Sequence, residues 1–293
     1  MAQAQSFVTN LELRDSNPDG SEGAGLSHTA KGMFLLHVLE VAAEGEPRGG
    51  VAIVHGAGDH GGRYTEVAGF LAERGWAVAL PDLRGHGKSE GERGHSWGIK
   101  EPVRDIDAVL DHLAYRLPDA PKVLVGVGLG GLYCLAYALA HADRVAAVVA
   151  INPLLEPRFP EPKKPSGLKG LFKKLQPTDA GPLGLDPAAL SSDPAAQAAW
   201  RADKHVHDLV SLHVAQRLPA EARAVREGLP GLRVPVLLLI GEADTLSDPQ
   251  QNQALLGAKA EVRRYPGLKH DLLHERGATQ IATEVAQWIA ARA

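Results

Sequence analysis

The chain has 293 residues, of which 44% are apolar and 23% charged, and its net charge is −4. This length and composition predict one large globular domain carrying an insertion, with a sizeable core. The acidic balance argues against a nucleic-acid partner, because phosphate binding requires a net basic surface. Cys134 is the single cysteine, so an intrachain disulfide is excluded.

The sequence gives no sign of a membrane or secretory segment. Residues 1–10 lack a basic stretch followed by an apolar one, which a signal peptide requires. The longest apolar runs are strand-sized, well short of the roughly 18–20 residues of a membrane span. We therefore expect a soluble, cytoplasmic protein.

Short apolar strands alternate with helices along most of the chain. Residues 1–30 are polar and predict a loose segment, with an edge strand near residues 7–14. The strands expected after it are 33–41, 51–55, 76–80, 122–127, 145–151, 234–240 and 261–265. The helices expected between and after them are 63–74, 102–117, 130–142, 249–257 and 279–291. This alternation predicts an α/β fold with a mostly parallel central sheet and helices on both faces.

Residues 153–222 interrupt that alternation. They are rich in proline and contain a basic amphipathic stretch with apolar residues at 168, 171, 172 and 175 and lysines at 169, 173 and 174. An insertion here lies over the carboxyl ends of the strands, where such sheets bind ligands. We interpret residues 153–222 as a cap on a core of residues 31–152 and 223–293. The basic stretch is either a cap helix with a solvated lysine face or a transient contact with an anionic membrane surface.

A glycine-rich segment, Gly-Val-Gly-Leu-Gly-Gly, follows the strand expected at 122–127. Gly126, Gly128 and Gly131 fit the dinucleotide pattern G-x-G-x-x-G, and the same segment fits the strand–turn–helix elbow G-x-S-x-G with Gly128 in place of serine. The dinucleotide pattern needs an acidic residue about 20 residues further on, at the end of the next strand. That strand ends in Ile151-Asn152-Pro153 without a carboxylate, so we expect no nucleotide cofactor.

The elbow interpretation makes further demands that the sequence meets. Asp244 follows the strand expected at 234–240, with Glu242 as a conceivable alternative acid, and His270 follows the last strand. Nucleophile, acid and histidine then occur in the chain order typical of α/β-hydrolases. The metalloprotease pattern is not met, because Asp271 rather than Glu follows His270, and no metal is expected.

Two loops resemble those of a known family. His55-Gly56-Ala57-Gly58-Asp59-His60, followed by Arg-Tyr at 63–64, resembles the oxyanion loop of monoacylglycerol lipases and related lysophospholipase-like hydrolases of the serine aminopeptidase S33 type. Residues 82–91 are similar to that family's next loop. The resemblance runs from about residue 33 to the C-terminus and is weakest in the cap.

The resemblance implies a carboxylic ester hydrolase that acts on a small lipid-like ester without a cofactor. It assigns His270 as the general base and Asp244 as the acid that orients it. It implies that the amides of Ala57 and Leu129 form the oxyanion hole. His55, Gly56 and Gly58 are implied to lie beside the substrate.

Position 128 departs from the family, which has its nucleophilic serine there, whereas Val127 varies at a more tolerant position. Glycine supplies no oxygen nucleophile. Three hypotheses follow: an esterase left inactive or crippled by glycine at this position, a natural pseudoenzyme that binds a lipid-like ligand without cleaving it, or hydrolysis by water that His270 activates. Glycine also adopts the strained elbow conformation freely, which serine does not.

Overall fold

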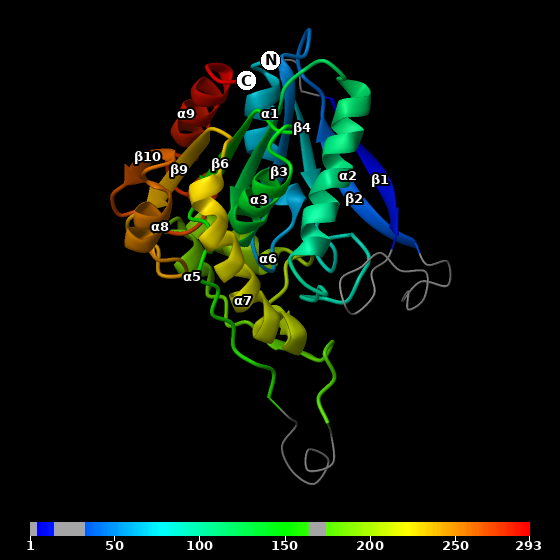
Figure 1. Ribbon diagram of the computed structural model, residues 1–293, viewed down its shortest axis with the longest axis vertical. Coiled ribbons are helices and arrows are strands. Elements are labelled where there is room, and N and C mark those ends of the chain that lie inside the picture. The colour runs from blue at the N-terminus through cyan, green and yellow to red at the C-terminus, as the bar shows by residue number, and fades with distance from the viewer. Residues whose placement is uncertain (1–4, 15–32, 164–173) are drawn as a thin grey trace.

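An eight-stranded sheet forms the centre of the computed structural model, which describes residues 5–14, 33–163 and 174–293 (Figure 1). Its strand order is β1-β2-β4-β3-β5-β6-β9-β10. The two N-terminal strands are β1 (Ser6–Arg14) and β2 (Met33–Val41), and β2 is antiparallel to both of its neighbours. The other strands are parallel: β3 (Gly49–Val54), β4 (Trp76–Pro81), β5 (Lys122–Val127), β6 (Ala147–Ile151), β9 (Val236–Gly241) and β10 (Ala260–Tyr265).

Helices cover both faces of this sheet, which confirms the predicted α/β architecture. Successive side chains of a strand point to opposite faces, so Leu124 of β5 joins one core cluster while Val123 and Val125 join the other. The first cluster is covered by α2 (Lys100–Arg116), α3 (Leu129–Ala140), α7 (Leu212–Gly228) and α8 (Pro249–Leu256). The second is covered by α1 (Thr65–Ala72) and α9 (Ala278–Ala290). The central strands are therefore buried on both sides and rich in Val, Ile and Leu.

The expected elements occur with small shifts in their bounds. The predicted edge strand is present as β1, which pairs with β2 from Ser6 opposite Val41 to Arg14 opposite Met33. The helix expected at 63–74 is divided into a 3-10 turn, η1 (Gly61–Tyr64), and α1. The remaining short turns are η2 (Leu229–Gly231) and η3 (Leu272–His274). The rest of the segment predicted to be loose lies almost wholly outside the described residues.

The region between β6 and β9 contains the elements that we expected to form a cap. It holds a two-stranded sheet, β7 (Ala180–Pro182) with β8 (Leu209–Ser211), and the helices α5 (Pro187–Leu190), α6 (Pro194–Ala202) and α7. Helix α7 continues past residue 222 to Gly228, so the predicted boundary falls inside it. Most of the basic amphipathic stretch, residues 168–173, lies outside the described residues.

Main-chain hydrogen bonds attach this inserted region to the core. The amide of His207 donates to the carbonyl of Gly58 at 2.8 Å. The amide of Ser211 donates to the carbonyl of Gly94 at 2.9 Å, and a third bond runs from the amide of Asp271 to the carbonyl of Leu190 at 2.8 Å. The contact at Gly58 is so close that the carbonyl of His207 overlaps the place where a Cβ would stand. Glycine is therefore required at position 58 by the approach of the inserted backbone as well as by its φ of +71°.

A buried ion network fixes the loop that follows β4. Arg84 donates from Nη1 to Glu101 at 2.6 Å and from Nη2 to Asp105 at 2.5 Å, and both carboxylates lie on α2. The Arg84 side chain is 7% exposed, and those of Glu101 and Asp105 are 2% and 0% exposed. Removing a single partner from such a network leaves uncompensated charge in a medium of low dielectric.

We predict that Arg84→Ala lowers the free energy of unfolding by about 3–5 kcal/mol, because two carboxylates lose their common partner. Urea unfolding of the two proteins measures the difference. Arg223→Ala is the matched control: that arginine pairs with Glu227 on the exposed face of α7 and should change stability by less than about 1 kcal/mol. Equal effects of the two substitutions would contradict the prediction.

Candidate active site

A sharp turn joins β5 to α3, and Gly128 is its central residue. Gly128 has φ +55° and ψ −114°, a conformation that a residue with a Cβ adopts only under strain. Its amide donates to the carbonyl of Ile151 at 2.9 Å, and its carbonyl accepts from the amide of Leu154 at 2.9 Å. The turn is thus held by the segment that follows β6, so its geometry does not depend on the side chain at position 128.

Asp244 and His270 form a buried hydrogen-bonded pair beside this turn. Asp244 lies in the turn after β9 and His270 lies after β10, and Nδ1 of the imidazole is 2.9 Å from Oδ2 of the carboxylate. Asp244 also accepts hydrogen bonds from the amide of Leu246 at 2.8 Å and from Oγ of Ser247 at 2.5 Å. Because an ionised carboxylate only accepts, Nδ1 carries the proton and Nε2 keeps a free lone pair. Glu242, the alternative acid, instead accepts a hydrogen bond from Arg264 at 2.6 Å.

The pair shifts the acidity of both partners. Burial disfavours the imidazolium form of His270, but the carboxylate of Asp244 outweighs that effect and raises the pKa of the ring. Burial likewise works against the ionised form of Asp244, yet His270 and the donors of residues 246–247 lower the pKa of this carboxyl. The site therefore holds an ionised carboxylate behind an imidazole of increased basicity.

The free nitrogen of this imidazole lies against Gly128. A Cβ built on Gly128 would overlap Nε2 of His270. The ring thus occupies part of the space that a side chain at position 128 would need. Any larger residue there requires the ring to withdraw.

Ala57 and Leu129 line the same cavity as His270. Ala57 follows β3, and Leu129 is the first residue of α3, where amides lack intrahelical acceptors. In the described part of the chain, neither amide donates to another protein group. Two residues whose amides lack a protein acceptor in this part of the chain thus line the cavity together with His270.

The three residues expected beside the substrate are separated by the structure. Gly56 lines the cavity, whereas Gly58 lines a smaller neighbouring one of about 40 Å³. His55 is 0% exposed, and its ring is used within the protein: Nε2 accepts from the amide of Leu83 at 2.9 Å, while Nδ1 lies 2.8 Å from the carbonyl of Gly56. Burial lowers the pKa of this ring. His55 therefore connects the loops after β3 and β4 and contacts no part of the described cavity.

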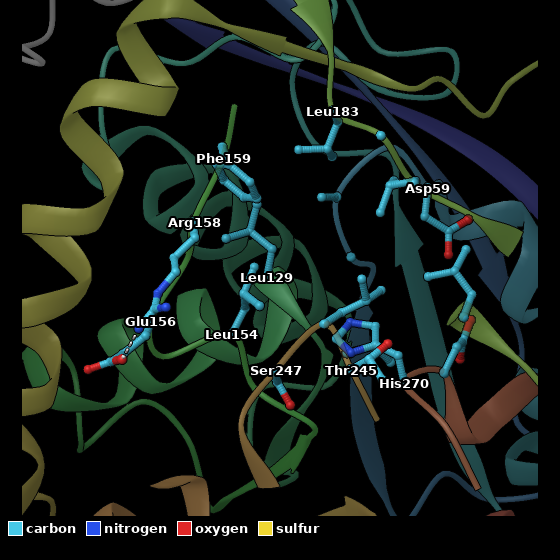
Figure 2. A pocket seen from close by; sticks show the side chains of 18 of the residues that line it. Asp59, Leu129, Leu154, Glu156, Arg158, Phe159, Leu183, Thr245, Ser247 and His270 are labelled. Carbon is cyan, nitrogen blue, oxygen red and sulfur yellow. Dashed lines mark ion pairs between the residues drawn. The ribbon is translucent and has the colours of Figure 1, made fainter. Parts of the chain in front are cut away.

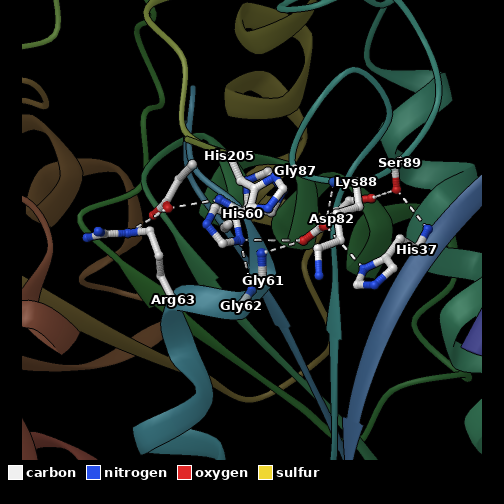
Figure 3. Close-up of polar contacts among 12 residues, drawn as sticks. His37, His60, Gly61, Gly62, Arg63, Asp82, Gly87, Lys88, Ser89 and His205 are labelled. Atoms are coloured by element: carbon white, nitrogen blue, oxygen red, sulfur yellow. Dashed lines mark hydrogen bonds and ion pairs between the residues drawn. The ribbon is translucent and has the colours of Figure 1, made fainter. Parts of the chain in front are cut away.

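Asp82 holds the neighbouring loops in place (Figure 3). Its two oxygens accept from the amides of Gly61 and Lys88, each at 2.8 Å, and the ring of His37 lies 3.2 Å away. Nε2 of His60 also lies 2.9 Å from Oδ2 of Asp203 in the inserted region. These contacts hold Gly61, which follows the loop of Ala57, against the loop after β4.

The cavity itself encloses about 370 Å³ and lies between the core loops and the inserted region (Figure 2). Its lining mixes apolar residues with charged ones, and the apolar ones include Leu154, Phe159, Leu183, Leu190 and Trp200. Glu156 and Arg158 lie beside Leu154 and Phe159 in Figure 2. The lining also includes the acidic residues Asp59 and Asp271, so the cavity offers both apolar and polar contacts to a ligand.

Asp271, which lines the cavity, belongs to a second acid–histidine pair that the sequence analysis missed. Asp271 Oδ2 lies 2.6 Å from Nδ1 of His274, whose Nε2 is 2.9 Å from the carbonyl of Arg63. The other oxygen, Oδ1 of Asp271, is buried and has no protein partner among the described residues. The position of Asp271 directly after His270 in the sequence was the signal that could have identified this pair.

Asn152 is the other residue that the sequence analysis missed. It is fully buried and has a φ of +41°, the one positive value among the described non-glycine residues. Its Nδ2 donates to the carbonyls of Lys269 at 2.9 Å and His270 at 2.8 Å, and its Oδ1 accepts from the amide of Gly241 at 2.9 Å. One side chain thus fixes the loop of His270 against the strand end that leads to Asp244.

We predict that Asn152→Gly folds but is destabilised by about 2–3 kcal/mol, because it keeps the backbone conformation and loses the three side-chain hydrogen bonds. The downfield proton resonance of His270 Nδ1 should shift or broaden as the pair with Asp244 loosens. Urea unfolding and proton NMR measure the two effects. Asn152→Asp, which replaces the Nδ2 donor with an acceptor, should lower the free energy of unfolding further than Asn152→Gly does. An unchanged His270 resonance in folded Asn152→Gly would limit Asn152 to a structural role.

A pH-dependent contribution to stability is expected from His274. Burial opposes the charge on this ring, but Asp271 raises its pKa from 6.5 to about 9. A raised folded-state pKa stabilises the protein fully below the unfolded value, and this stabilisation is lost as the pH rises through about 9. The native chain should exceed His274→Gln in unfolding free energy by roughly 2–3 kcal/mol at about pH 6, and the margin should narrow by about pH 10. A margin that is the same at both pH values would contradict this assignment.

The fold and the site together define an α/β-hydrolase: a mostly parallel sheet, a strand–turn–helix elbow at Gly128, and an acid–histidine pair after the last two strands. The chain belongs to the family described as serine aminopeptidase S33, which matches residues 45–277.

The relatives of the chain include several lipases. It is 29% identical to a monoacylglycerol lipase of Mycolicibacterium smegmatis, covering 83% of this chain and 89% of that protein. It is 31% identical to a monoglyceride lipase of Mus musculus, covering 85% and 84%. The crystal structure of the Paleococcus ferrophilus monoacylglycerol lipase is similar at a TM-score of 0.75 and 27% identity, covering 88% of this chain and 99% of that one.

Two further properties concern the described residues alone. None of the helices there is both long and apolar enough to cross a membrane. No three His, Cys, Asp or Glu side chains come together there in a way that could hold a metal ion.

Proposed function

We propose that the cavity is the active site of a carboxylic ester hydrolase of the monoacylglycerol lipase type, and that Gly128 stands where the mechanism needs a serine. The contact between Nε2 of His270 and Gly128 carries this proposal. The imidazole directs its free lone pair at the elbow residue, with Asp244 bonded behind it. This is the relation that a general base has to a nucleophile.

A serine at position 128 would complete an acyl-transfer mechanism. His270 would take the proton of the hydroxyl as Oγ attacks the ester carbonyl, and Asp244 would stabilise the resulting imidazolium. The amides of Ala57 and Leu129 would hold the oxyanion. With glycine there, the chain keeps these supporting groups and lacks the oxygen that forms the acyl-enzyme.

The cavity suits a lipid-like ester with an acyl chain and a polar head group. Its lining includes leucine, phenylalanine and tryptophan residues that can contact an acyl chain, and the carboxylate of Asp59, which can accept a hydrogen bond from a hydroxyl group. Arg158 belongs to the same lining and can pair with a phosphate. The proposed substrates therefore include both monoacylglycerol and lysophospholipid-like esters.

The other two hypotheses use the same cavity. Binding of a lipid-like ester without cleavage needs only the cavity and is supported by Gly128 itself. Hydrolysis by water that His270 activates is less well supported, because a base and oxyanion donors without a nucleophile accelerate such reactions by only about 10³–10⁴-fold over water. If the native chain binds monoacylglycerol without hydrolysing it, the hypothesis of a non-catalytic binding protein is favoured.

We predict that Gly128→Ser hydrolyses monoacylglycerols and p-nitrophenyl esters at least about 10³-fold faster than the native chain, since loss of a nucleophile costs up to about 10⁶ in comparable enzymes. The variant should be less stable by about 1–3 kcal/mol, because serine is strained at this turn and the ring of His270 must withdraw. Fatty acid release and urea unfolding measure the two effects.

Gly128→Ala is the matched control, because it introduces the same Cβ and the same backbone strain without a hydroxyl. It should unfold at a similar urea concentration and gain no activity. Adding His270→Gln to Gly128→Ser should abolish the gain. A folded serine variant that is no more active than the alanine variant would remove the proposed nucleophile position.

A further inference from the structure

The imidazole of His270 is the group in this cavity that presents a free lone pair where an attacking atom is needed. Its Nδ1–H is bonded to Asp244 at 2.9 Å, so the tautomer is fixed and Nε2 is unprotonated in the neutral ring. Nε2 reaches into the volume of a side chain at position 128. Ala57 and Leu129, whose amides have no protein acceptor among the described residues, line the same cavity.

We propose that His270 itself acts as a nucleophile in the native chain, toward activated acyl compounds such as aryl esters and thioesters, and forms an acyl-imidazole at Nε2. This inference goes beyond the proposed function: it uses the same cavity, but it does not require a serine at position 128.

The steps balance with water as the only other reactant. The Nε2 lone pair attacks the carbonyl carbon, and the amides of Ala57 and Leu129 hold the resulting oxyanion. Collapse of this intermediate breaks the bond to the leaving group, which departs as a phenolate or thiolate with its electron pair. Asp244 stabilises the positive charge on the acylated ring. Water then attacks the acyl carbon and loses a proton to solvent, and the bond to Nε2 breaks so that the neutral ring is regenerated. The carboxylic acid released loses its own proton to solvent and departs as the carboxylate.

The same geometry restricts the substrates. A glycerol alkoxide is a poor leaving group and needs a proton as it departs. In a serine mechanism His270 donates that proton, but here His270 carries the acyl group and cannot. Phenolates and thiolates leave without it. The native chain should therefore turn over p-nitrophenyl acetate and acyl thioesters while leaving monoacylglycerols intact.

The first test is isolation of the intermediate. Native protein is mixed with p-nitrophenyl acetate, quenched within seconds in denaturant at neutral pH, and measured at once by mass spectrometry as intact protein and after a brief digest. We expect an acetyl group on His270 that hydroxylamine removes. His270→Gln should release p-nitrophenol about tenfold more slowly or worse, whereas His141→Gln, which changes a histidine at the end of α3 outside the cavity lining, should match the native chain.

The second test separates attack by the ring from attack by activated water. Hydroxylamine added to the reaction should yield acetyl hydroxamate without changing the rate of the initial burst of p-nitrophenol, because acylation precedes the step that it intercepts. Asp244→Asn, which keeps the shape of the pair, should slow the release of p-nitrophenol even if His270→Gln fails to fold.

Absence of acetyl-His270 together with hydroxamate that forms only in proportion to a faster initial release of p-nitrophenol would overturn the proposal. Rates in His270→Gln equal to those of the native chain would do the same. Neither result would affect the proposed function, which depends on the gain of monoacylglycerol hydrolysis in Gly128→Ser.

Discussion

The hydrogen bond between Asp244 and His270 is the interaction on which the candidate site depends. It fixes one nitrogen of the ring as a donor and leaves the other free, and both pKa shifts at the site follow from it. The bond joins loops that follow different strands, so it exists only while the sheet keeps those strand ends together. Asn152, which directly follows β6, hydrogen-bonds to His270 and to Gly241 at the end of β9. The end of β6 therefore helps to hold Asp244 and His270 at bonding distance.

Much of this architecture could be predicted from the sequence. The alternation of strand-sized apolar runs with amphipathic helices gave the sheet, because a strand buried on both faces must be apolar throughout. Chain order alone brought Asp244 and His270 to the same edge of the sheet as the glycine-rich turn, since parallel strands end together there. Even the edge strand β1 was visible in the sequence before its partner could be assigned.

The parts that could not be predicted depend on distances that no sequence pattern encodes. Asn152 appears in the sequence as a polar residue after a strand, and only the fold shows that its amide reaches two loops more than eighty residues away. For His55 the sequence analysis predicted a place beside the substrate that the structure does not show. This residue lies next to the cavity loop in sequence, but its side chain is buried and accepts a hydrogen bond from the amide of Leu83. The overlap between Nε2 of His270 and a Cβ at position 128 also depends on the folded structure. It determines whether the ring can stay in place when a larger residue replaces the glycine.

The attachment of the inserted region to the core has a consequence for how such a site can diversify. Its contacts at Gly58, Gly94 and Leu190 use main-chain amides and carbonyls, which every residue type apart from proline supplies in the same form. Side chains in that region can therefore be exchanged for others without weakening those anchors. Selectivity for a new ligand can then evolve, or be engineered, by changing the lining alone while the scaffold beneath keeps its shape.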